Sequence, residues 1–275
     1  MRPSIRLLVL AAAVTATLAA CNRDKDKAAA PAPPSNAAIT PATAGAPFEF
    51  KSETPYATTS LKLPQAVRPL PELHVRLYSS AVADLKTFAE GAQADRSEAG
   101  DDPDIPGYTQ DIVFDTPVET GKLFSLARTD AEFTGGAHGN VGYSGVIWDK
   151  ALKRPVEGLA LFRKGANLSA LDTALCAAIN VEKKKLDPEA AILTLGEGAD
   201  MWSCPRARDI AFVLAAGSTP GKAGGLTFMV GPYVAGPYSD GSYWVNVPQS
   251  VIRSLIDPAY ADEFAGDPTP LPEPA

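Results

Sequence analysis

The residues with the most chemical potential lie in one short stretch, Thr134-Gly135-Gly136-Ala137-His138-Gly139-Asn140. It holds one of the two histidines of the chain, three glycines and an asparagine. Glycine tolerates positive φ angles, so the backbone can turn sharply here and leave N–H groups and the imidazole open to a ligand. The same glycines suit a tight connection between two strands, with His138 hydrogen-bonded inside the fold. The pattern predicts either a binding loop (Gly135, Gly136, His138, Gly139 and Asn140) or a structural turn.

Catalytic and metal-binding patterns do not form around the two histidines. A zinc site needs three or more ligands, and His74 lies far from His138 in the sequence. No G-x-S-x-G sequence marks a nucleophile elbow. Because both patterns are missing, we expect no enzymatic activity, no metal and no cofactor. An uncharacterised hydrolase that uses carboxylates such as Glu132 and Asp149 is the alternative hypothesis.

Aromatic residues gather near the C-terminal end, where Tyr233, Tyr238, Tyr243 and Trp244 follow one another closely. Tyrosine has an apolar ring and a polar tip, so Tyr233 and Tyr238 are candidates for stacking on a sugar ring. Aromatic residues are also enriched in strands, and all four could instead be core and sheet-face residues.

The first residues predict export. Arg2 and Arg6 precede an apolar run, Leu7 to Leu18, that is too short to span a bilayer. Leu18-Ala19-Ala20-Cys21 resembles the lipobox of bacterial lipoproteins, which implies cleavage after residue 20 and acylation of Cys21. Several acyl chains anchor a protein firmly, because each buried CH₂ contributes ~0.8 kcal/mol. Asn22 favours the outer membrane, facing the periplasm; an ordinary signal peptide with an incidental cysteine is the alternative.

The charge of the chain limits its partners. Removing residues 1–20 would take away Arg2 and Arg6 and no acidic residue, so the net charge of −7 would become −9. Such a surface disfavours nucleic acid and favours a basic protein. Residues 21–47 are rich in Ala and Pro, with a few Ser, Thr and Asn, and show no apolar periodicity, which is typical of a disordered tether.

Two further cysteines, Cys176 and Cys204, remain if Cys21 is lipidated. An even pair in an oxidising compartment predicts a disulfide between them. Its loop would contribute about 3–4 kcal/mol in the chain-entropy model. Two buried free thiols are the alternative.

The elements that must position these residues follow from the spacing of apolar side chains. A helix is expected from Pro71 and another after Asn167, and an antiparallel meander is expected from residues 108–148. The acidic stretch 91–107 predicts a solvated loop. We expect an α+β fold in which antiparallel sheets pack with a few helices in two small subdomains. The division is a signal peptide (1–20), a tether (21–47), an N-terminal α+β subdomain (48–130), a C-terminal α+β subdomain with the glycine motif (131–256) and a frayed tail (257–275).

The Gly-Gly-Ala-His-Gly core is followed by Trp148-Asp149, the Leu161-Phe162 pair and Gly231-Pro232-Tyr233, with Pro237-Tyr238, Gly241 and Val247-Pro248 further on. From about Phe48 to Ile256 this pattern resembles a bacterial extracytoplasmic family of unknown function, the DUF3298 type with a DUF4163-type N-terminal half. Such domains form the outer part of RsiV, a lysozyme-sensing anti-sigma factor, and the non-catalytic N-terminal part of the deacetylase PdaC. The resemblance implies a sheet-with-helices fold and, through RsiV, the capture of lysozyme. It does not extend to sigma-factor binding or to deacetylation.

We therefore expect a membrane-anchored periplasmic or cell-surface lipoprotein that acts as a non-catalytic binding module. Its expected partners are the lipid bilayer, through acylated Cys21, and a basic wall hydrolase such as lysozyme. Binding of peptidoglycan or another glycan through Tyr233 and Tyr238 is the first alternative, and the uncharacterised hydrolase is the second.

Overall fold

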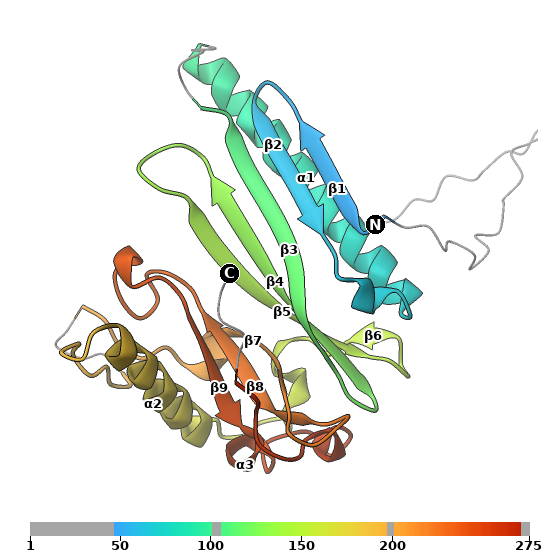
Figure 1. Cartoon of the computed structure of the whole chain (residues 1–275), viewed down its shortest axis with the longest axis vertical. Helices are drawn as coiled ribbons and strands as arrows, with labels where there is room; N and C mark the ends of the chain where they lie inside the picture. Colours follow the sequence, from blue (N-terminus) through green and yellow to red (C-terminus); the bar gives the residue numbers. More distant parts are fainter. Residues whose placement is uncertain (1–46, 101–105, 197–200, 271–275) are drawn as a thin grey trace, which may run out of the picture. The chain divides into compact units, whose positions relative to one another are not determined.

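A computed structural model describes residues 47–100, 106–196 and 201–270, which form two β-sheets and a few helices (Figure 1). The expected α+β class is confirmed. The expected signal peptide, Cys21 and nearly all of the expected tether lie outside the described residues. Five short 3₁₀ helices connect the larger elements: η1 (Gln65–Val67), η2 (Gly158–Leu161), η3 (Ala207–Asp209), η4 (Tyr238–Asp240) and η5 (Ala261–Glu263).

The first sheet has six strands, whose spatial order follows the chain. They are β1 (Glu49–Glu53), β2 (Ala57–Lys62), β3 (Tyr108–Glu119), β4 (Leu123–Phe133), β5 (Asn140–Asp149) and β6 (Arg154–Pro155). The expected meander is present, because β3, β4 and β5 pair antiparallel. One pair departs from the antiparallel pattern of this sheet: β2 and β3 are parallel, because a long helix connects them and returns the chain to the same end of the sheet.

That helix is α1 (Pro71–Ala99), which Figure 1 shows lying along β1 and β2. Proline at the first turn suits a helix start, and Gly100, at φ 85°, ends it. Its buried stripe is Leu73, His74, Leu77, Ala81, Leu85 and Ala92. The loop expected from residue 91 was therefore wrong up to residue 99: α1 runs through Gly91, because good helix formers such as Ala92, Gln93 and Ala94 follow it.

The core explains why β4 is central. Its residues Leu123–Ala127 are all buried, although successive side chains of a strand point to opposite faces. Phe124 and Leu126 belong to the cluster that packs on α1, whereas Leu123 and Ala127 pack with residues of the second sheet. The hydroxyl of Ser125 accepts a hydrogen bond from the Leu214 N–H at 3.0 Å, which joins the two sheets directly.

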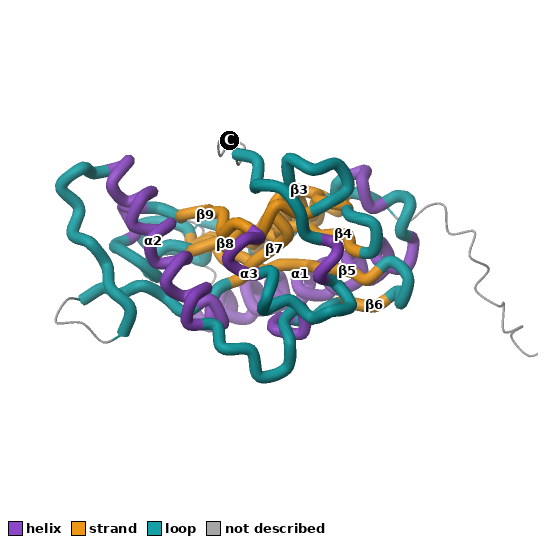
Figure 2. Tube along the Cα trace, turned by 90° about the horizontal axis from the view of Figure 1, so that it is seen from below, coloured by secondary structure: helices purple, strands orange, loops and turns teal. Residues whose placement is uncertain are grey.

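The second sheet has three antiparallel strands, β7 (Ala211–Ala216), β8 (Ala223–Val230) and β9 (Tyr243–Pro248). Every residue of β8 is buried. Two helices accompany this sheet, α2 (Ser169–Leu186) beside β9 and the short α3 (Gln249–Ile252) (Figure 2). Within the described ranges, neither these helices nor α1 are long and apolar enough to cross a bilayer.

The predicted disulfide is confirmed: Cys176 of α2 is bonded to Cys204, with an S–S distance of 1.99 Å. Asn180, one turn further along α2, bonds the backbone of Leu193 twice: its amide donates to the carbonyl at 2.9 Å and its oxygen accepts from the N–H at 2.8 Å. The chain after α2 is thus held to this helix by the disulfide at Cys204 and by two hydrogen bonds at Leu193.

Two expected boundaries were wrong. The boundary at residues 130 and 131 falls inside β4, so the division between the sheets comes after β6 instead. The frayed tail expected from residue 257 is ordered as far as residue 270: Phe264 is 0% exposed and forms a bridge with Ala223 of β8. The prolines of this segment suggested disorder, but its aromatic side chains fill the core of the second sheet.

Candidate functional site

The glycine-rich stretch joins β4 to β5. Glu132 and Asn140 are the last paired residues of the two strands, and residues 134–139 form the turn between them. Gly135 and Gly136 have φ angles of 92° and 89°, in the region that only glycine adopts without strain. The sequence therefore needs glycine here for the backbone, as the structural interpretation of the motif proposed.

The same turn also brings its histidine against the predicted tyrosines. The ring of His138 stacks on that of Tyr238, with centroids 3.7 Å apart and planes 17° apart. The Tyr233 hydroxyl lies 3.2 Å from Nε2 of His138, and the two tyrosine rings lie 5.6 Å apart. We call His138, Tyr233 and Tyr238 the aromatic cluster. It unites two sets of residues that the sequence flagged separately.

The hydrogen bonds of His138 assign its proton. Nδ1 lies 2.8 Å from the carbonyl oxygen of Gly139, which can only accept, so Nδ1 carries the hydrogen. In the neutral imidazole Nε2 then accepts from the hydroxyl of Tyr233. The neutral ring has no donor left to offer a ligand. What the cluster presents is ring surface and phenolic oxygen, which attract cations and hydrogen-bond donors.

Tyr233 is strained and accessible. Its φ angle is 64°, in the left-handed region, which costs a residue with a side chain about 1–2 kcal/mol. The residue is nevertheless 51% exposed, and the neighbouring Val234 is exposed as well. Such outliers persist where surrounding contacts enforce them, and they gather at binding sites.

A partly buried ion pair holds the loop that bears the two tyrosines, residues 231–242. Nζ of Lys183, in α2, donates to Oδ2 of Asp240 at 2.7 Å, and the Tyr243 hydroxyl donates to the same oxygen at 3.0 Å. Burial lowers the pKa of Lys183, but the hydrogen bond and charge of Asp240 outweigh it and raise this pKa above its usual value. The hydrogen bond from Lys183 also lowers the pKa of Asp240. The pair stays ionised at neutral pH.

Sequence reasoning missed this pair, although a signal was present. Leu171, Leu175 and Ile179 mark the buried stripe of α2 at intervals of four, and Lys183 is the next position. A lysine that continues an apolar stripe is turned toward the core, and burying its charge is costly unless an anion pairs with it. The partner, Asp240, lies 57 residues away in the sequence and could not be identified from spacing.

The two carboxylates of the hydrolase hypothesis do not come together. Glu132 is paired at the turn end of the hairpin, whereas Asp149 pairs with Leu123 at its other end. Nine residues of extended strand separate them, about 30 Å. Asp149 is buried, accepts from the N–H groups of Ala151 and Leu152 and from the Tyr260 hydroxyl, and thereby closes a turn.

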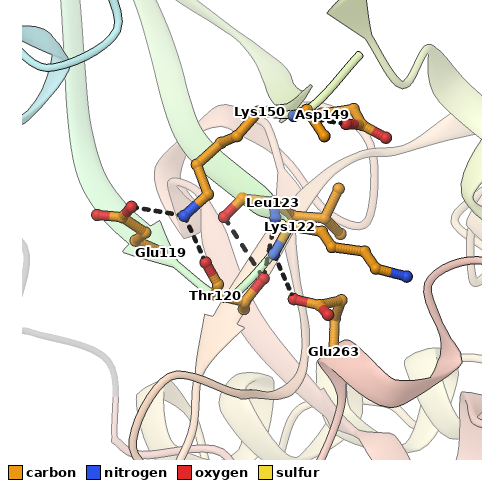
Figure 3. A network of polar contacts seen from close by, with 8 residues as sticks. Glu119, Thr120, Lys122, Leu123, Asp149, Lys150 and Glu263 are labelled. Carbon is orange, nitrogen blue, oxygen red and sulfur yellow. Dashed lines mark hydrogen bonds and ion pairs between the residues drawn. The ribbon is translucent and has the colours of Figure 1, made fainter. Parts of the chain in front are cut away.

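The end of the hairpin near Asp149 holds a polar network (Figure 3). Oε2 of Glu263 accepts the backbone N–H of Lys122 at 2.7 Å, while Nζ of Lys150 donates to Glu119 and to the Thr120 carbonyl, each at 2.6 Å. Burial raises the pKa of Glu263, but hydrogen bonds from Thr120 and Lys122 and nearby lysine charges outweigh it, so this pKa is lowered. These groups are satisfied by their own chain, as expected of a structural network.

The other predicted or candidate positions lie apart from the aromatic cluster. His74 is buried in α1, where Nε2 lies 3.1 Å from the Pro47 carbonyl oxygen and the ring packs on Phe48. Tyr243 is buried, and Trp244 packs edge-on against Tyr143. Among the residues that the structure describes, no group of three His, Cys, Asp or Glu side chains could hold a metal ion. An open groove of about 520 Å³ beside Phe162 and Arg163 contains none of the predicted site residues.

Comparisons with known proteins find the fold in solved structures. No family model matches the sequence, and no curated protein matches it. A DUF3298 family protein from Pseudomonas aeruginosa PAO1 is similar in structure, with a TM-score of 0.50 and 17% identity over 79% of this chain and 94% of that one. A second member of that family, from Bacteroides fragilis, has a TM-score of 0.48 and 17% identity over 78% of this chain and 94% of its own. The chain therefore has the α+β fold found in the DUF3298 family.

Proposed function

We propose that this protein is a non-catalytic binding module and that the aromatic cluster is its binding surface. The observation that carries the proposal is the convergence of His138, Tyr233 and Tyr238 from two segments almost a hundred residues apart. They meet at an accessible turn, and Tyr233 is held half-exposed in a strained conformation. Tyrosines in such positions supply much of the binding energy in protein interfaces.

The partner that best fits this surface is a basic protein. The cluster offers phenolic oxygen and aromatic faces, and these interact favourably with the guanidinium or ammonium group of Arg or Lys. The chain as a whole carries a net charge of −7, which attracts a cationic partner over long range. The sequence resemblance to the outer part of a lysozyme-sensing protein makes lysozyme the first partner to test.

We also propose that the module is exported and held on the outer membrane, facing the periplasm, by acylated Cys21. The apolar segment after Arg2 and Arg6 and the Leu-Ala-Ala-Cys sequence support this proposal. A lipid anchor would present the binding surface where cell-wall hydrolases act. Metabolic labelling with a fatty acid, compared between the native chain and Cys21→Ser, tests it: incorporation should be lost in the variant, and equal incorporation would contradict acylation at this residue.

The binding proposal is tested by titrating lysozyme into the full chain by calorimetry, at low ionic strength and at about 0.15 M. We expect association that weakens with salt, and a loss of ~10-fold or more in affinity, about 1.4 kcal/mol, in Tyr233→Ala. Leu152→Ala is the control, because Leu152 is similarly exposed but follows the other end of β5. No association at micromolar concentrations, or equal affinity for the native chain and Tyr233→Ala, would contradict the proposal.

The exposed ring of Tyr233 also favours a second candidate, a glycan of the cell wall. A flat aromatic surface with a polar tip suits the apolar face of a sugar. Cosedimentation with purified peptidoglycan separates the two candidates. Retention of the native chain but not of Tyr233→Ala, without lysozyme binding, would favour the glycan.

A further inference from the structure

The side chain of Lys183 is largely removed from solvent. The residue is 9% exposed and occupies the buried stripe of α2. A buried charge is tolerated only when partners replace the water it has lost. Nothing in the proposed binding surface uses Lys183 directly, so its presence at this position needs another explanation.

The partners of Lys183 come from one segment, the loop 231–242 and the strand that follows it. Nζ donates to the Ala235 carbonyl at 3.2 Å and to Asp240 at 2.7 Å, and it lies 3.5 Å from the Tyr243 hydroxyl. A Cβ at Gly236 would collide with the Asp240 carboxylate and come within 3.0 Å of Nζ. The loop lies close to the charge, and a side chain at position 236 would have to displace the Asp240 carboxylate from its present place.

The loop carries both tyrosines of the aromatic cluster, each two residues before a contact with Lys183. Tyr233 precedes Ala235, and Tyr238 precedes Asp240. The loop is also tied to β5, by the hydrogen bond from the Tyr143 hydroxyl to Ser242, at 3.0 Å. The loop that carries the tyrosines is thus bonded to a charge that lies on a different element, α2.

We propose that Lys183 and Asp240 form a latch that assembles the binding surface. Lys183 acts as a positioning residue: it touches no ligand, and it holds the loop so that Tyr238 stacks on His138 and Tyr233 keeps its strained backbone. The role of the latch in binding rests on the proposed function. The assembly of the aromatic cluster does not, because it can be measured without any ligand.

The chain offers a direct readout, since it has two histidines and only one of them is in the cluster. The full chain labelled at histidine gives two sets of ring signals in an NMR spectrum. Stacking on Tyr238 displaces the His138 signals, and Tyr238→Ala gives their unstacked positions. His74, buried in α1, reports whether the fold persists.

In Lys183→Met we expect the His138 signals to move to their positions in Tyr238→Ala, while those of His74 stay in place. Lys185→Met is the matched control, because Lys185 lies on the same helix, exposed and paired with Glu182, and its substitution should move neither signal. If Lys183→Met unfolds the chain, Asp240→Asn gives the test, since it keeps the side-chain shape and removes the charge. Unmoved His138 signals in whichever of these variants remains folded would overturn the latch.

Lysozyme binding by the same variants separates the two proposals. If the latch and the binding surface are both correct, Lys183→Met loses ~10-fold or more in affinity, and Lys185→Met keeps most of it. If the His138 signals move but the native chain does not bind lysozyme, the latch stands and the proposed partner fails. If Lys183→Met binds lysozyme as tightly as the native chain although its His138 signals have moved to their unstacked positions, the aromatic cluster is not the binding surface.

Discussion

Polar side chains gather at both ends of the β4–β5 hairpin, but their accessibility and their bonding differ. At one end, Glu263, Asp149 and Lys150 are largely buried, and each polar group is bonded to its own chain (Figure 3). At the other end, His138 and Tyr233 are exposed, and they meet through contacts that leave ring faces and phenolic oxygen available. Polar residues alone therefore do not distinguish a candidate binding site. Accessibility and unused hydrogen-bonding capacity distinguish the turn end from the buried end.

Backbone strain occurs at both ends. At the buried end, Asp149 and Thr120 close turns by accepting N–H groups, and Lys153, in the connection after Asp149, has a φ angle of 50°. The turn end needs two glycines at positive φ and a strained tyrosine, held by contacts with another element. We propose that the buried end carries stability and that the turn end serves binding, and this division can be tested one end at a time.

The largest expected effect comes from Phe264, which lies in the C-terminal segment beside Glu263. Its ring is fully buried and packs in the core of the second sheet. Phe264→Ala should lower the free energy of unfolding by about 3–5 kcal/mol, because it removes apolar contacts and leaves a cavity. Urea denaturation measures the loss. A loss under about 1 kcal/mol would mean that residues 257–270 are not part of the stable fold.

A smaller effect is expected from Glu263→Gln. The charged acceptor for the Lys122 N–H becomes neutral, so the free energy of unfolding at pH 7 should fall by about 1–2 kcal/mol. Because the pKa of Glu263 is lowered in the folded chain, the stability it contributes is present above the unfolded value, about 4.3, and is lost as the pH falls through the folded pKa. The difference between the native chain and the variant should therefore shrink on acidification.

The control for this prediction is Glu189→Gln, whose side chain is exposed. It should change the free energy of unfolding by less than about 0.5 kcal/mol. A difference between the native chain and Glu263→Gln that stays constant from neutral pH down to acid would rule out the ionised Glu263 as its source.

The smallest effect on stability is expected at the turn end, in Tyr233→Gly. Glycine relieves the strain of the positive φ angle, which offsets the lost contacts, so the free energy of unfolding should change by less than about 1 kcal/mol. Affinity for lysozyme should nevertheless fall ~10-fold or more. A large loss of stability without a loss of binding would reverse the roles that we assign to the two ends.

Much of the fold could be predicted from local signals. The start of α1 at Pro71, the strands on either side of the glycine turn and the pairing of the two cysteines all followed from residue type and spacing. Errors arose where a local signal was outweighed by packing. Gly91 and its acidic neighbours suggested a loop, but the helix continues to Ala99. The prolines after residue 257 suggested disorder, although aromatic residues of that segment pack in the core.

The candidate site could be predicted in its parts but not in its assembly. His138 and the tyrosines were each identified, with a structural and a functional interpretation left open. The structure brings them together through the packing of two sheets and through Lys183, contacts between residues far apart in the sequence. His138 also fits both interpretations, because it bonds within its own turn and forms part of an exposed surface. Local spacing carries no information on such contacts.

The binding role of the turn end is tested most directly by adding lysozyme to the histidine-labelled full chain and following both sets of ring signals by NMR. We expect the His138 signals to move progressively with added lysozyme, and those of His74, buried in α1, to remain in place. Association measured by calorimetry in the same sample, with the His138 signals unmoved, would contradict the assignment of the aromatic cluster as the binding surface.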